Sequence, residues 1–137
     1  SDAVVEKVAE AAVRSKQVVM VVDDSITMRK VTSRILERNN FEVILARDGL
    51  EAIEKMAEQV PDLVLLDIEM PRMDGYEVAQ NMKSDERLMN VPIMMITSRT
   101  GDKHRQRALD LGVERYLGKP YQELELMRQV NEVFNNK

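Results

Sequence analysis

Four runs of apolar residues, each too short for a helix, recur along the chain and constrain the fold more than any other feature. Three of them are apolar at nearly every position, without an alternating polar side. That pattern is typical of strands covered by helices on both faces, as in parallel sheets. The sequence therefore predicts strands at Val18 to Val22, Val43 to Leu45, Leu63 to Leu66 and Ile93 to Ile96.

The segments between these runs carry apolar residues three or four positions apart, which predicts helices docked on the sheet. A weaker fifth strand fits Arg115 to Leu117, between a helix around Lys103 to Leu111 and a final helix from Gln122 to Phe134. Ser25 is a candidate cap for the first of these helices. The fold class is therefore α/β, with five βα units. The stripes are Val31 and Ile35; Ile53, Met56 and Ala57; Val78, Ala79 and Met82; and Leu124, Met127, Val130 and Phe134.

The composition favours one globular domain and excludes several kinds of site. The 137 residues suit one domain, and 44% are hydrophobic and 32% charged. The absence of cysteine excludes disulfides and thiolate chemistry, and a net charge of -4 argues against direct nucleic-acid binding. Because no long apolar run or export leader is present, we expect no membrane insertion and a cytoplasmic location.

Residues 1–16 differ from the rest because they carry no strand or turn signal, although Val4, Val8 and Ala12 have helical spacing. We interpret them as a linker or terminal extension and residues 17–137 as the folded domain. Two readings of the extension stay open: a frayed terminus, or the end of a helix from an upstream domain.

Residues suited to metal and phosphate chemistry follow four of the predicted strands. The carboxyl ends of parallel strands form one edge of the sheet, where ligands bind. Side chains that follow different strands are therefore expected to converge there. They are Asp23 and Asp24 after the first strand, Asp67 after the third, Thr97 and Ser98 at the end of the fourth, and Lys119 with Pro120 after the fifth.

Three converging carboxylates would repel one another unless a hard divalent cation lay among them, and Mg²⁺ is the natural occupant. Lys119 would add a positive charge and Thr97 a hydroxyl donor, both complementary to a phosphoryl group. Aspartate is a known nucleophile in phosphoryl transfer. We therefore assign Asp67, at the end of the central strand, as the phosphoacceptor.

The motifs Asp23-Asp24-Ser25, Asp67 to Gly75, Thr97-Ser98 and Lys119-Pro120, in this order and spacing, resemble CheY-like response-regulator receiver domains. The resemblance covers residues 17 to about 135. It implies a flavodoxin-like three-layer sandwich with a parallel five-stranded sheet of order 2-1-3-4-5. It also places a cis peptide bond at Lys119-Pro120.

The resemblance implies specific roles for the site residues. Asp67 would take its phosphoryl group from a phosphohistidine on a histidine kinase or histidine phosphotransfer domain. Mg²⁺ would be bound by Asp24, Asp67 and the backbone carbonyl of Glu69, with Asp23 acting largely through water. The domain would thus catalyse its own aspartyl phosphorylation and dephosphorylation.

The same resemblance implies a conformational switch. Lys119 and Thr97 would sense the phosphoryl group, Ser98 would help to bind it, and the ring of Tyr116 would turn inward as Thr97 moves. A downstream signalling protein would then bind the face formed by the last two predicted helices and the strand between them. His104, the single histidine, lies in a polar helix start, and we expect it to be solvated.

Other functions are compatible with the same α/β topology. A flavodoxin-type flavin site is disfavoured because Asp23 and Asp24 would repel the phosphate of the flavin. A dehalogenase-type phosphatase is disfavoured because Glu69 occupies the position at which that family needs a second Asp as acid/base. A degenerate receiver that only binds proteins is the main alternative.

We expect the parent protein to be either a stand-alone chemotaxis-type regulator or a hybrid histidine kinase, and residues 1–16 favour the hybrid. The stretch from Ile96 to Gly101 and the segment Lys119-Pro120-Tyr121 also resemble the C-terminal receiver of chemotaxis-type (CheA-like) hybrid histidine kinases.

Overall fold

The computed structural model describes residues 1–14 and 16–136, with the side chains of residues 9–14 left aside. Five strands form one parallel sheet in the order β2-β1-β3-β4-β5, which is the order that the resemblance to receiver domains implies. The strands are β1 (Val18–Val22), β2 (Glu42–Ala46), β3 (Leu63–Leu66), β4 (Ile93–Thr97) and β5 (Arg115–Gly118). The helices are α1 (Asp2–Arg14), α2 (Ile26–Arg38), α3 (Gly49–Glu58), α4 (Gly75–Lys83), α5 (Asp102–Asp110) and α6 (Glu123–Asn135).

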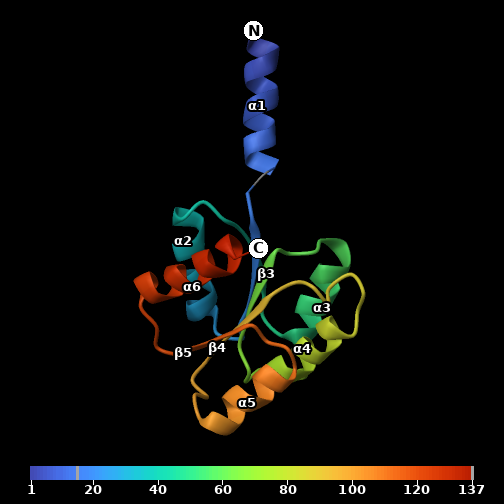
Figure 1. Ribbon diagram of the computed structural model, residues 1–137, viewed down its shortest axis with the longest axis vertical. Coiled ribbons are helices and arrows are strands. Elements are labelled where there is room, and N and C mark those ends of the chain that lie inside the picture. Colours follow the sequence, from blue (N-terminus) through green and yellow to red (C-terminus); the bar gives the residue numbers. More distant parts are fainter. Residues whose placement is uncertain (15, 137) are drawn as a thin grey trace.

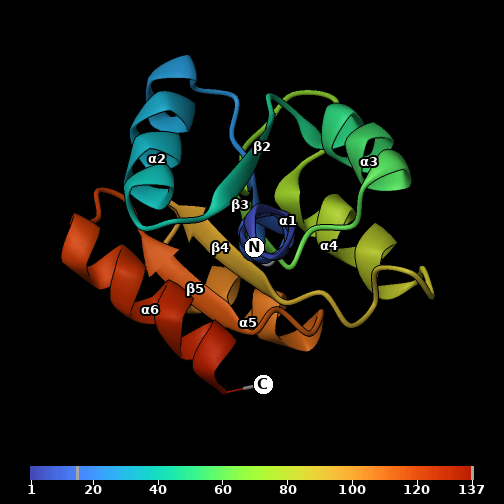
Figure 2. The same ribbon diagram turned by 90° about the horizontal axis from the view of Figure 1, so that it is seen from above.

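The sheet lies between two helical layers, with α2 and α6 on one face and α3, α4 and α5 on the other (Figure 2). Successive residues of β1 alternate between these layers: Val19 and Val21 pack toward α2 and α6, and Met20 and Val22 toward the other helices. Because both faces are covered, all residues of β1, β3 and β4 are buried. The unbroken apolar runs of the sequence have this cause.

Three residues of the predicted helical stripes do not face the sheet. Val31, Ala57 and Leu124 are exposed, Leu124 by 82%. Each lies one or two positions from a buried residue of its helix. One position turns the side chain by about 100° around the helix axis. On α2, the neighbouring buried position is occupied by the hydroxyl residue Thr32, which the apolar pattern could not identify.

Side-chain caps begin α2, α3 and α4, where Ser25, Asp48 and Asp74 each accept a hydrogen bond from a backbone N–H of the first turn. The predicted Ser25 cap is thereby confirmed. The N-caps of α5 and α6, Gly101 and Gln122, make no such bond. The last two helices are therefore held in place by other contacts.

The helix α1 extends away from the sandwich at the amino end of β1 (Figure 1). Its Val4 and Val8 side chains are exposed, and the predicted Ala12 position lies outside the described side chains. Of the helices in the described part of the chain, none has the length and apolar character needed to cross a membrane.

Candidate functional site

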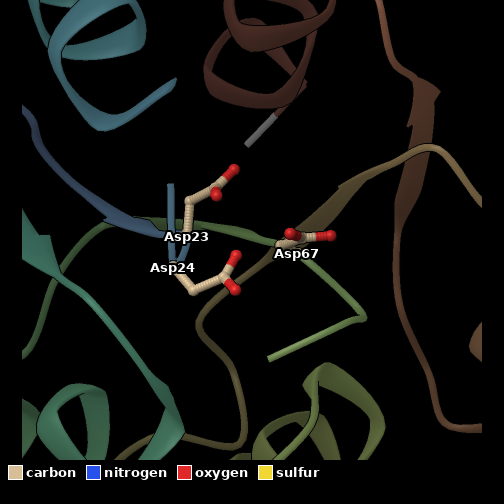
Figure 3. A group of neighbouring side chains, drawn as sticks. All are labelled: Asp23, Asp24 and Asp67. Carbon is tan, nitrogen blue, oxygen red and sulfur yellow. The ribbon is translucent and has the colours of Figure 1, made fainter. Parts of the chain in front are cut away.

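The end of β1 and the end of β3 bring three carboxylates together. Val22 of β1 pairs with Leu66 of β3, so the residues that follow them lie side by side. Each of Asp23, Asp24 and Asp67 offers an oxygen within 4.8 Å of the others (Figure 3). The structure thus brings together the three aspartates that the strand ends predicted.

Asp23 is held in place by both its backbone and its side chain. Its N–H donates to the carbonyl of Ala46, and its carbonyl accepts a 2.7 Å bond from Arg29 Nη1. One carboxylate oxygen, Oδ1, accepts from the N–H of Ser25 at 2.9 Å, and the side chain is buried. Asp24, one residue later, is exposed and lines an open cavity of about 530 Å³. The two neighbours therefore differ: Asp23 is part of the scaffold, and Asp24 is accessible.

Asp67 is buried but lies at the rim of the site, with 8% of its surface exposed. Its N–H donates to the carbonyl of Val22, which ties the start of its loop to β1. The loop then folds back so closely that a Cβ on Gly75 would lie 2.2 Å from the Asp67 carbonyl oxygen. Only glycine permits this approach, so Gly75 helps to fix the position of Asp67.

The ammonium group of Lys119 lies between two of the carboxylates. Its Nζ is 2.6 Å from Asp23 Oδ2 and 3.3 Å from Asp67 Oδ2. The backbone N–H of Lys119 donates to the carbonyl of Thr97 at 2.8 Å, and the Lys119–Pro120 peptide is cis, as the resemblance to receiver domains implies. Lys119 therefore reaches the acidic cluster from β5, on the far side of β4.

Burial and charge shift the pKa values of this cluster. Burial raises the pKa of Asp67, and the neighbouring Asp23 adds to the effect, although Lys119 opposes it. Burial also disfavours the charged form of Lys119, but the hydrogen bond to Asp23 and the charge of Asp67 outweigh it and raise the pKa of Lys119. The carboxylates thus still repel one another, although the Lys119 ammonium lies beside them.

The donor set fits a hard divalent cation. Three carboxylates and one ammonium leave two negative charges uncompensated, and the exposed Asp24 provides an open side. Mg²⁺ prefers oxygen ligands and commonly binds one or two carboxylates with several waters. Glu69 lies in the loop after β3 and lines the same cavity as Asp24. The expected role of its carbonyl as a metal ligand stays a prediction.

Thr97 and Ser98, at the end of β4, point in different directions. Thr97 is fully buried, and its Oγ1 accepts a 3.1 Å bond from the backbone N–H of Arg99. Ser98 is exposed and lines a separate groove beside Lys119 and Pro120. The phosphate-binding role assigned to Ser98 therefore stays a prediction.

Tyr116 is tied to the loop that follows Thr97. Its hydroxyl donates to the backbone carbonyl of Arg99, and the Arg105 guanidinium lies 5.1 Å from the ring centroid. Burial is the main cause that raises the pKa of Tyr116 to about 12, so the hydroxyl stays protonated and available as a donor. Arg99 therefore connects the two residues that we expect to act in the switch, Thr97 and Tyr116.

Two contacts around the cavity were not predicted from the sequence. The Arg99 guanidinium forms an ion pair with the Glu69 carboxylate. His104, which we expected to be solvated, is only partly exposed: its Nδ1 lies 2.9 Å from the Tyr76 hydroxyl and its ring stacks on that of Tyr76. Both contacts join residues about 30 positions apart, and no local pattern marks such partners.

Comparison with known proteins identifies related sequences and structures. The family described as the response regulator receiver domain matches residues 19–131. Protein PilG of Pseudomonas aeruginosa is 35% identical over 80% of this chain and 81% of its own length. Hybrid signal transduction histidine kinase D of Dictyostelium discoideum is 36% identical over 86% of this chain, which spans only 8% of that protein.

Solved structures agree with the sequence comparison. The Vibrio cholerae chemotaxis response regulator CheY4 superimposes with a TM-score of 0.84 at 30% identity, covering 87% of this chain and 99% of that one. The receiver domain of a signal transduction histidine kinase from Syntrophus aciditrophicus gives a TM-score of 0.81 at 27% identity, covering 88% and 91%. The flavodoxin-like order of the sheet is shared with these neighbours.

Proposed function

Because the chain belongs to the response regulator receiver family of two-component signalling, we propose that it accepts a phosphoryl group on Asp67 from a phosphohistidine, in a reaction that depends on Mg²⁺. The observation that carries this proposal is the convergence of Asp23, Asp24 and Asp67 within 4.8 Å, with the Lys119 ammonium beside them. Receiver domains act with histidine kinases or phosphotransfer proteins, which supply the donor.

Asp24, Asp67 and the backbone carbonyl of Glu69 would hold the Mg²⁺ ion, with Asp23 contributing through water. The exposure of Asp24 and its place on the open cavity support this division. When bound, Mg²⁺ would neutralise negative charge on the carboxylates and on the phosphoryl oxygens. Asp23, which already binds Ser25 and Lys119, is the least available for direct coordination.

In the transfer step, an Asp67 carboxylate oxygen forms a bond to phosphorus while the phosphorus–nitrogen bond to the donor histidine breaks. The bonding electron pair leaves with the imidazole nitrogen. The Lys119 ammonium, 3.3 Å from Asp67, is close enough to stabilise charge on the phosphoryl oxygens. Catalysis of this kind depends mainly on positioning and electrostatics.

The product would bias the loop after β4. The Thr97 hydroxyl would turn from the Arg99 N–H to the new phosphoryl oxygen, with Ser98 as a further donor. That movement would free the Arg99 carbonyl from Tyr116, whose ring could then turn inward. The shared attachment of Thr97 and Tyr116 to Arg99 supports this coupling. The signal would be read on the face formed by α5, β5 and α6.

We further propose that residues 17–137 form the receiver and residues 1–16 a linker. The family match, which begins at residue 19, supports this boundary. The relatives are consistent with either kind of parent protein, since this chain spans 81% of Protein PilG but only 8% of the hybrid histidine kinase. The cytoplasm, where phosphohistidine donors and Mg²⁺ meet, is the location consistent with this chemistry.

Incubation with phosphoramidate and Mg²⁺ tests the proposal, with intact mass as the readout. We expect one added phosphoryl group in the wild type and none in Asp67→Asn. Asp48→Asn is the matched control, since Asp48 is also a buried aspartate but caps α3 outside the cluster. No labelling of the wild type would favour the degenerate receiver, and labelling of Asp67→Asn would refute the acceptor assignment.

Two substitutions separate metal binding from transfer. Asp24→Asn removes an exposed carboxylate and should weaken Mg²⁺ binding in calorimetry. Lys119→Ala removes the internal cation and should keep Mg²⁺ binding while slowing phosphorylation. If Asp24→Asn kept Mg²⁺ binding and Lys119→Ala weakened it, the roles assigned to Asp24 and Lys119 would be reversed.

A further inference from the structure

The loop that carries Lys119 joins β5 to α6 with few local anchors. β5 ends at Gly118 and α6 begins at Glu123, and the N-cap residue Gln122 makes no side-chain cap bond. The bond from the Lys119 N–H to Thr97 fixes the start of this loop. The other end needs a different anchor, because the usual capping device is missing.

Two contacts with α2 anchor this end: an exposed ion pair between Arg38 and Glu123, and a hydrogen bond between two hydroxyls deeper in the fold. The Tyr121 hydroxyl lies 2.5 Å from Oγ1 of Thr32 on α2, a residue 89 positions away in the chain. Thr32 is 3% exposed, and the Tyr121 ring packs against the core shared by α2 and α6. Burial raises the pKa of Tyr121, so its hydroxyl stays protonated at neutral pH. The bond is therefore a partly buried tertiary contact.

Thr32 also lies directly beneath the acidic cluster. It lines a void of about 10 Å³ together with Asp23 and Asp67. The helix α2 that carries Thr32 begins just after Asp23 and Asp24, at the Ser25 cap. The hydroxyl bond thus joins the floor of the carboxylate cluster to the loop that carries Lys119.

The position of the Lys119 ammonium depends on where its backbone is held. Lysine has a long side chain with four rotatable bonds, and a small backbone shift changes which oxygens its charge can reach. Lys119 Nζ is now closer to Asp23, at 2.6 Å, than to Asp67, at 3.3 Å. A shift of the loop away from α2 would carry the ammonium away from both.

We propose that the Tyr121–Thr32 hydrogen bond is a positioning contact for the phosphotransfer reaction, which holds Lys119 against Asp23 and Asp67. The inference rests on the proposed function and adds Tyr121 and Thr32 to it as residues that act through Lys119. Neither side chain touches the phosphoryl group. Their effect is on the geometry of the lysine.

The test measures the phosphorylation rate with phosphoramidate and Mg²⁺ at a temperature well below each variant's unfolding midpoint. Tyr121→Phe and Thr32→Val each remove one hydroxyl and little volume. Each should lower the rate at saturating phosphoramidate about tenfold, as misplacement of a catalytic group does, and leave Mg²⁺ affinity unchanged. Because one bond is lost in every case, the double variant should be no slower than either single one.

Two controls distinguish positioning from a general structural effect. Tyr76→Phe removes a hydroxyl that bonds to His104 instead, and should keep the wild-type rate within about twofold. In a Lys119→Ala background, Tyr121→Phe should cause no further slowing, although it should still lower stability.

The possible outcomes separate this inference from the proposed function. Two results would overturn the positioning role while leaving Asp67 as the acceptor. One is a Tyr121→Phe variant that is phosphorylated as fast as the wild type. The other is a Tyr121→Phe substitution that slows phosphorylation as much in the Lys119→Ala background as in the wild type. A wild-type chain that takes up no phosphoryl group would overturn both.

Discussion

The helices α5 and α6, which precede and follow β5 in the chain, are attached to the sheet in different ways. α6 buries Leu126, Met127 and Val130 in the core that it shares with α2. Of the residues of α5, all of which the structure describes, Ala108 alone is buried, and Leu109 is 60% exposed. α6 thus buries a continuous apolar surface, whereas α5 buries a single methyl group.

Polar and aromatic contacts hold α5 instead. His104 bonds to Tyr76, the Arg107 guanidinium lies 4.0 Å from the Tyr76 ring centroid, and Arg105 lies over Tyr116. Such contacts are directional and few, so a small rearrangement can exchange them. Elements with little buried apolar surface are those that open or move at low cost. The comparison indicates that the proposed phosphoryl site lies on a well-packed frame, whereas the helix expected to report its state buries little apolar surface.

The largest expected effect comes from a matched pair of leucine truncations. Leu126→Ala should lower the free energy of unfolding by about 2 to 5 kcal/mol, because it leaves a cavity in the core. Leu109→Ala, on the exposed side of α5, should change it by less than about 0.5 kcal/mol. Urea unfolding measures both. Similar losses of stability in the two variants would contradict the proposed difference in how α5 and α6 are attached.

A smaller effect should follow loss of the side-chain N-cap of α3, which α5 does not have. The bond from the Glu51 N–H is the main cause that lowers the pKa of Asp48, and Arg72 adds to it. Asp48→Ala should cost about 1 to 2 kcal/mol at neutral pH.

The cap contribution also has a predicted pH dependence. Because the folded-state pKa of Asp48 is lowered, the contribution is fully present above the unfolded value of 3.8 and disappears as pH falls through the folded value. Asp48→Asn, which keeps a capping oxygen without charge, should lose this dependence. Unfolding curves between neutral and acidic pH show the difference, and a pH-independent cost of Asp48→Ala would contradict it.

The smallest effect should come from adding a cap to α5. Gly101 has an extended backbone with φ of -64°, and an added Cβ would meet only His104 Cδ2 at 3.9 Å. Gly101→Ser should therefore stabilise the protein by about 0.5 kcal/mol and slow hydrogen exchange of the α5 amides. Unchanged exchange in α5 would mean that its first turn is already held as firmly as those of the capped helices.

The sequence predicted the sheet and the carboxylate cluster for a shared reason. In a parallel sheet covered on both faces, burial makes the inner strands β1, β3 and β4 unbroken apolar runs, so the polar residues that follow them mark the carboxyl edge. The edge strand β5 is a weaker run, and its place was predicted from its position between two helices. Asp23, Asp24, Asp67 and Lys119 meet there because the strands β1, β3, β4 and β5 are neighbours. Spacing along the chain was enough to find them.

Tertiary contacts between side chains were not predictable in the same way. Thr32 is buried with its hydroxyl bonded to that of Tyr121, whereas the more hydrophobic Val31 beside it is exposed. His104 was expected in solvent because its neighbours are charged, but Tyr76 provides a partner from another helix. Such pairs depend on which helices the fold brings together.

The most direct test of the central claim is chemical trapping of the acceptor. An aspartyl phosphate is an acyl phosphate, and borohydride reduces it to homoserine at the modified position only. After treatment with phosphoramidate and Mg²⁺, peptide mass mapping should find homoserine at position 67 and intact aspartate at positions 23 and 24. Homoserine at another position, with Asp67 unchanged, would contradict the account.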